Sequence, residues 1–104
     1  MAGSLALRDE RSVTRDEVHF RTRVFGPDGR GHPILIVNIS AAGLMARCEA
    51  EFAVGDRVKV ALPVVGNVPG EIRWSLGGRI GCELDKAIDL ASYYELLAAL
   101  VKGR

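Results

Sequence analysis

Two short groups of residues in this chain carry side chains suited to binding an anionic nucleotide. The first is the pair Arg11 and Arg15, in a polar N-terminal stretch. A guanidinium presents a planar fork of donors that matches a phosphate or the O6/N7 edge of guanine, and it can also stack on a base. Two arginines four positions apart on an arm could close on a ligand from one side. The RxxxR pattern alone is weak evidence, because this chain is rich in arginine.

The second group is Asn38, Ser40 and Gly43, within the sequence NISAAG. An Asn amide offers both donors and an acceptor to a base edge, and a Ser hydroxyl can do either. Gly permits a positive φ or a close approach of the backbone. Taken alone, these residues could form an ordinary turn. Together with the arginines, these residues predict a binding site with two sides. Asn38, Ser40 and Gly43 would form the fixed side, and the N-terminal arm would form the mobile side.

The elements that must position these residues are mostly strands. Residues 1–17 show no periodicity and predict a flexible arm that carries RxxxR. Alternating or apolar runs predict strands near residues 18–24, 33–37, 44–48, 57–62, 71–76 and 79–85. Residues 63–70 contain two Pro and two Gly, which indicates a loop or a ragged edge strand.

A helix should end the chain. Leu90, Tyr93, Tyr94, Leu97, Leu100 and Val101 recur at helical spacing, which predicts a helix over about 89–102. Asp89 is placed to cap it. Short strands without crossover helices predict a mainly β fold, an antiparallel barrel spanning residues 18–104 together with this helix. The helix would plug one barrel mouth or cover an open edge.

The strand pattern also predicts the environment of several side chains. Trp74 shares a predicted strand face with Ile72, which favours a place in the core. Cys48 and Cys82 fall on apolar strands and are expected to be small buried residues. His19 and His32 have no metal ligands at suitable spacing, so no metal site is predicted.

Composition excludes several classes of function. The 104 residues make one domain, and a net charge of +1 disfavours binding to bulk nucleic acid or membranes. A nucleic-acid-binding barrel of the OB or SH3 type remains a minor alternative, since aromatics are only 6% of residues. The chain shows no catalytic motif, signal peptide or membrane-length apolar run, so a cytoplasmic protein that is not an enzyme is expected.

RxxxR followed by [DN]xSxxG resembles the PilZ family, whose members bind the bacterial second messenger cyclic di-GMP. The resemblance covers roughly residues 8–102 and extends to the strand 55–60 and to Trp74 followed by 80–84. It implies a six-stranded antiparallel barrel, of the split-barrel or Greek-key type, with a C-terminal helix.

By this resemblance Arg11 and Arg15 would clamp guanine and phosphate, often around a stacked cyclic di-GMP dimer. Asn38, Ser40 and Gly43 would meet the other half of the ligand, with Arg8 as a possible auxiliary outside the motif. No other cofactor is implied. Four acidic residues near the arginines could pair with them in the free state: Asp9, Glu10, Asp16 and Glu17.

Two functions follow from the resemblance. In the first, ligand binding orders the arm against the barrel, and an unidentified effector protein recognises the changed surface in motility, polysaccharide or biofilm control. In the second, the domain is an adaptor that acts through protein contacts without a ligand. The intact arginines and NISAAG sequence favour the first.

Overall fold

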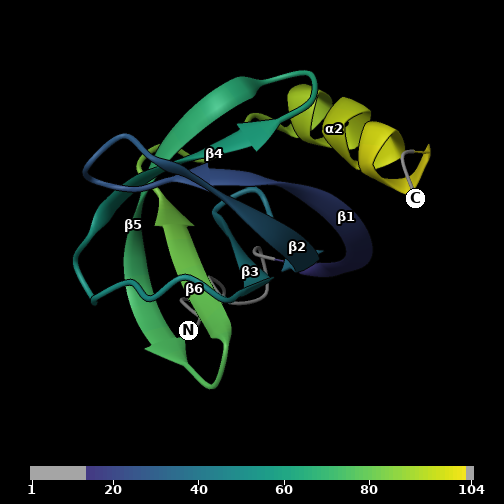
Figure 1. Cartoon of the computed structure of the whole chain (residues 1–104). Coiled ribbons are helices and arrows are strands. Elements are labelled where there is room, and N and C mark those ends of the chain that lie inside the picture. The colour runs from purple at the N-terminus through teal and green to yellow at the C-terminus, as the bar shows by residue number, and fades with distance from the viewer. Residues whose placement is uncertain (1–13, 103–104) are drawn as a thin grey trace, which may run out of the picture.

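Six antiparallel strands close into a barrel in the computed structural model, which describes residues 14–102 (Figure 1). The elements are β1 (Asp16–Phe25), β2 (Gly31–Ile39), β3 (Gly43–Cys48), β4 (Arg57–Leu62), β5 (Gly66–Leu76), β6 (Arg79–Leu84) and α2 (Leu90–Lys102). Their order around the barrel is β1-β2-β3-β6-β5-β4, and β4 pairs with β1 to close it. The predicted fold class, a mainly β barrel with one C-terminal helix, is confirmed.

The barrel consists of two three-stranded meanders. Tight turns join β1 to β2 to β3, and β4 to β5 to β6. The connection over residues 49–56 carries β4 back to the free side of β1, so that the first four strands have the order of a Greek key. Pairing of β3 with β6 completes the cylinder and brings the second predicted motif next to the last strand.

Alternation of side chains places the core as the sequence predicts. In β4, Val58, Val60 and Leu62 are buried, whereas Arg57 and Lys59 are exposed. Both cysteines are buried and carry free thiols, as expected. The inward residues of all six strands form one apolar cluster. Because a protein interior is close-packed, it keeps the strands and the residues on their outer faces in fixed positions.

Helix α2 packs against β1, and Figure 1 shows it beside one end of the barrel. Asp89 accepts a hydrogen bond of 3.1 Å from the Ser92 N–H, so the predicted cap is confirmed. The buried residues of the helix are Tyr93, Leu96 and Leu100, which join the barrel cluster. Because the described strands close into a barrel, they leave no sheet edge for the helix to cover. No helix within residues 14–102 is long and apolar enough to cross a membrane.

The apolar stripe predicted on α2 is only partly buried. Leu90, Tyr94 and Val101 are all at least half exposed, because the helix meets the barrel along a narrower face than the stripe.

Strand β1 begins at Asp16, two residues before the predicted strand. Strand β5 begins at Gly66, since residues 66–71 pair fully with β4 and only three residues form the turn.

Candidate ligand-binding site

A hollow of about 350 Å³ lies where the start of β1 meets the β2–β3 connection and strands β5 and β6. Four of the five residues predicted to bind the ligand line it: Arg15, Asn38, Ser40 and Gly43. The fifth, Arg11, and the auxiliary Arg8 lie outside the described residues. The volume is at the lower end of the range for small-molecule sites. Two segments far apart in the sequence therefore meet at one place.

The Arg15 guanidinium joins the two motifs directly. Its Nη1 donates a hydrogen bond of 2.5 Å to Oδ1 of Asn38. The Asn38 amide nitrogen in turn lies 3.8 Å from the sulfur of Met45, its neighbour across β2 and β3. A guanidinium carries five N–H donors, and this contact occupies one of them. Arg15 therefore has further donors for an anion while Asn38 holds its position.

Ser40 shapes the connection between β2 and β3. Its hydroxyl oxygen accepts hydrogen bonds from the N–H groups of Ala42 at 3.1 Å and Gly43 at 3.2 Å. The Ser40 N–H donates to the Gly43 carbonyl oxygen at 2.8 Å, and the side chain is almost fully buried. The structure thus gives Ser40 a role in fixing the turn, a side-chain use that serine commonly has in loops. Its contact with a ligand stays a prediction.

Gly43 is required by the close approach of β3 to β6. A Cβ added at this position would lie 2.5 Å from the carbonyl oxygen of Cys82. Of the two properties considered for this glycine, close approach applies and positive φ does not. The neighbour that approaches is the barrel's own backbone. Gly43 therefore allows β3 and β6 to pair closely at the place where both strands line the hollow.

The strand pairing contains three irregularities, two of which precede residues that line the hollow. The register shifts between Glu17 and Phe20 in β1, between Ile36 and Asn38 in β2, and between Ile72 and Trp74 in β5. A bulge bends a strand and changes the direction of the side chain next to it. Asn38 and Trp74 both follow such shifts and both line the hollow.

The expectation that Trp74 is a core residue is wrong. Trp74 is 40% exposed, whereas Ile72 is fully buried, because the bulge between them ends the alternation that would place both inside. The indole lies over Gly81, where an added Cβ would be 2.1 Å from Nε1. The sequence signal was Gly81 itself, since a glycine inside a strand often marks a close approach.

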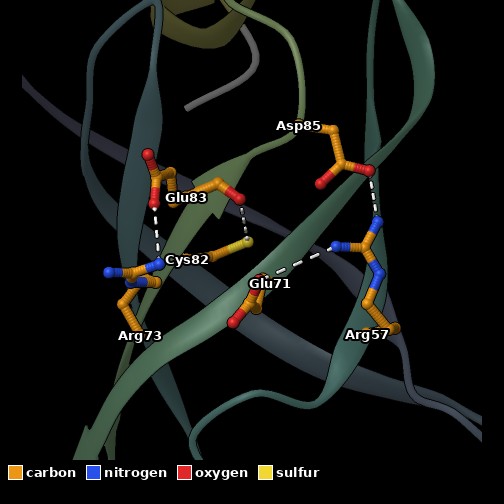
Figure 2. Close-up of polar contacts among 6 residues, drawn as sticks. All are labelled: Arg57, Glu71, Arg73, Cys82, Glu83 and Asp85. Carbon is orange, nitrogen blue, oxygen red and sulfur yellow. Dashed lines mark hydrogen bonds and ion pairs between the residues drawn. The ribbon is translucent and has the colours of Figure 1, made fainter.

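Charged residues of β4, β5 and β6, together with Asp85 directly after β6, form ion pairs with one another (Figure 2). Arg73 pairs with Glu83 at 3.2 Å, and both line the hollow. Farther along, Arg57 pairs with Asp85 and lies 3.9 Å from Glu71. The hydrogen bond from Arg57 lowers the pKa of Asp85. With Arg15 added, the charged residues lining the hollow have an excess of positive charge.

The buried thiol of Cys82 beside the hollow is neutral. Desolvation raises the pKa of the Cys82 thiol to about 11, so this residue is protonated at neutral pH. Within residues 14–102 no group of His, Cys, Asp and Glu side chains is arranged to hold a metal ion. The arrangement is suited to an anion with flat, polar rings, which arginine, amide and indole groups all contact well.

Comparison with known proteins bears on this site. The family model described as PilZ domain matches residues 8–103 of the chain. Among solved structures, the PilZ domain of CeSA from a cellulose-synthesizing bacterium superposes with a TM-score of 0.60. That match is 15% identical and covers 84% of this chain and 94% of the other, so it shows a shared fold. No curated protein matches the chain in sequence.

Proposed function

Because the chain belongs to the PilZ domain family, a family of cyclic di-GMP receptors, we propose that it is a single-domain receptor for this second messenger. PilZ domains are ligand-binding or adaptor domains and are not known as enzymes. In the proposal, Arg11 and Arg15 act together with Asn38, Ser40 and Gly43, and the ligand binds as one molecule or as a stacked dimer. Binding then orders the arm and changes the surface that an effector protein meets.

The hydrogen bond between Arg15 and Asn38 is the observation that carries this proposal. It brings one arginine of RxxxR and the first residue of NxSxxG to the same hollow. The remaining Arg15 donors and the excess of positive charge suit a phosphodiester.

Each lining residue has a distinct part in the proposed complex. Arg15 would pair with a phosphate or the O6/N7 edge of guanine, and Asn38 would face a base edge. Ser40 and Gly43 would act mainly by shaping the wall, given the internal hydrogen bonds of the turn. Trp74 adds an indole face on which a guanine could stack. This last assignment enlarges the site predicted from the sequence.

Signalling in this proposal depends on the segment before Arg15. The arginines of the arm would be held by the ligand against the hollow, and the cost of ordering the arm would lower the affinity. The proposal places the protein in the bacterial cytoplasm. The two cysteines support that location, because both are free thiols.

Calorimetric titration with cyclic di-GMP tests the proposal, with GTP as the control ligand. The wild-type chain should bind one or two molecules of cyclic di-GMP and no GTP. The double variant Arg11→Ala/Arg15→Ala should lose this binding. A matched variant, Arg30→Ala, removes an exposed arginine of the β1–β2 turn and should bind normally.

The possible failures have different meanings. Unchanged affinity in the double variant would disprove the assigned site. No heat and no thermal shift with wild-type protein would disprove the receptor function. Binding of a partner protein that is identical with and without cyclic di-GMP would support the adaptor alternative.

A further inference from the structure

A row of five paired residues crosses the outer face of the barrel. Arg21 of β1 pairs with Leu35 of β2, Leu35 with Arg47 of β3, Arg47 with Arg79 of β6, and Arg79 with Leu76 of β5. Directly paired residues of antiparallel strands point to the same face. At about 4.8 Å between neighbouring strands, the row is roughly 19 Å long. We call these five residues the outer row.

The first leucine of the outer row is covered although it points away from the core. Its neighbours Ile34 and Ile36 are buried in the interior cluster, and Leu35 is not part of that cluster. Leu35 is nevertheless only 8% exposed. Its cross-strand partners are Arg21 and Arg47, whose aliphatic stems can cover an apolar residue while the guanidinium reaches water. The stems of Arg21 and Arg47 are therefore placed to cover Leu35.

The charges of the outer row are not balanced locally. Among the described residues, Arg21, Arg47 and Arg79 form no ion pair, in contrast to Arg57 and Arg73. All five residues line one broad hollow, and within residues 14–102 Glu49 is the only acidic residue that lines it with them. Leu76, at the far end, is 79% exposed, although it is a large apolar side chain.

We propose that the outer row is a docking surface for an acidic segment of a partner protein, with an aliphatic side chain of that partner packed on Leu76. Three guanidiniums over a span of several strands are complementary to carboxylates in an extended chain. The exposed Leu76 supplies apolar contact area. The row runs Arg21, Leu35, Arg47, Arg79 and Leu76, so the exposed leucine lies at one end of the three charges.

A nucleic acid fits this surface less well than a polypeptide. In the part of the chain that the structure describes, no Phe, Tyr or Trp lines the hollow, whereas binding of single strands relies on aromatic stacking. The net charge of +1 also supplies little of the positive field that nucleic acids require. An acidic peptide needs only the local arginines and an apolar anchor.

The outer row lies next to the candidate ligand site without sharing its residues. Met45 lines the ligand hollow, and Arg47, two residues farther along β3, belongs to the row. Both residues point away from the core, so the two surfaces are neighbours on the barrel exterior. Docking at the outer row does not require a bound ligand, because it depends on the charges and the strand pairing of the row alone.

The probe for this proposal is a fluorescein-labelled peptide with leucines spaced among glutamates, measured by fluorescence anisotropy at low salt. The double variant Arg47→Glu/Arg79→Glu should bind it at least about tenfold more weakly. Lys59→Glu is the matched control, because it reverses an exposed charge on β4, which does not contribute to the row. Leu76→Ser should weaken binding of this peptide but leave binding of a glutamate–serine peptide unaffected.

Three further measurements separate the possible outcomes. Amide chemical shifts should move at the outer row when the peptide is added, and Arg15→Ala should keep peptide binding even if it loses cyclic di-GMP. Each variant's thermal melt verifies that it is folded. Peptide binding that is equal in the double variant and wild type would overturn the proposal. So would binding of a single-stranded oligonucleotide or of anionic lipid vesicles in preference to the peptide.

Discussion

The Tyr93 hydroxyl lies 2.6 Å from Oδ2 of Asp16, the residue that directly follows Arg15. The same hydroxyl is 3.0 Å from the carbonyl oxygen of Ile39, so helix α2 contacts the start of β1 and the end of β2 together. Burial and the neighbouring Asp16 carboxylate raise the pKa of Tyr93 and keep it protonated as a donor. The C-terminal helix is thereby tied to the start of β1, next to Arg15.

Tyr93→Phe should lower the free energy of unfolding by about 1 kcal/mol, the usual net value of a hydrogen bond to a partly buried group. Tyr94→Phe is the matched control, since Tyr94 is the next residue and is exposed. Urea denaturation followed by circular dichroism measures both. Equal stabilities of the two variants would show that the contact with Asp16 contributes nothing.

Ser40→Ala should cost about 1–3 kcal/mol of stability, because the N–H groups of Ala42 and Gly43 lose the acceptor that satisfies them. Ser75→Ala, on an exposed position of β5, should change stability little and serves as control. Thermal and urea unfolding provide the comparison. A Ser40→Ala protein as stable as wild type would mean that water replaces the hydroxyl.

Most of the fold could be predicted because the barrel strands are covered on one face and therefore alternate. Strands β4 and β6 and helix α2 lie within a residue or two of their predicted ranges. Residues 66–70 were more difficult, since the Pro and Gly residues suggest a loop when pairing with β4 cannot be seen. The exposed part of the helix stripe was missed because apolar spacing does not reveal how wide a contact will be.

The candidate site was only partly predictable from the sequence. The motif residues Arg15 and Asn38 could be identified from residue type and order, and the structure places them in contact. Trp74 could not be identified as a residue of the candidate site, because a bulge changes the direction of a side chain without altering the apolar pattern before it. For Ser40, residue type and spacing do not distinguish a hydroxyl that faces a ligand from one that satisfies its own turn.

Trp74→Ala should weaken binding of cyclic di-GMP by roughly 10- to 100-fold, if an indole–guanine stack contributes about 1–3 kcal/mol. Trp74→Phe should retain part of the affinity, because a phenyl ring can also stack. Since the chain contains a single tryptophan, quenching of its fluorescence on addition of the ligand gives a direct readout in the wild type. Full affinity in Trp74→Ala would remove this residue from the proposed site.

Asp85→Asn should reduce the acid sensitivity of the fold. The hydrogen bond from Arg57 lowers the pKa of Asp85 below its ordinary value of 3.8, so the unfolded chain binds this proton more readily. The stabilisation is therefore present above the ordinary value and is lost as the pH falls through the lower, folded pKa. Unfolding measured at neutral and at acid pH should show a smaller difference in the variant. Glu49→Gln, an exposed position, should leave that difference as in the wild type.

The native thiols should react slowly with a disulfide reagent at pH 8. Burial raises the pKa of Cys82 to about 11, so only about a thousandth of it is thiolate at that pH, and burial also raises the pKa of Cys48. Access is the second barrier, because both sulfur atoms belong to the core side of their strands. The reaction rate should therefore rise at least about a hundredfold in denaturant, where thiols regain their ordinary pKa. Rapid release of one equivalent of chromophore from the folded protein would show that the β3–β6 pairing opens readily beneath the ligand hollow.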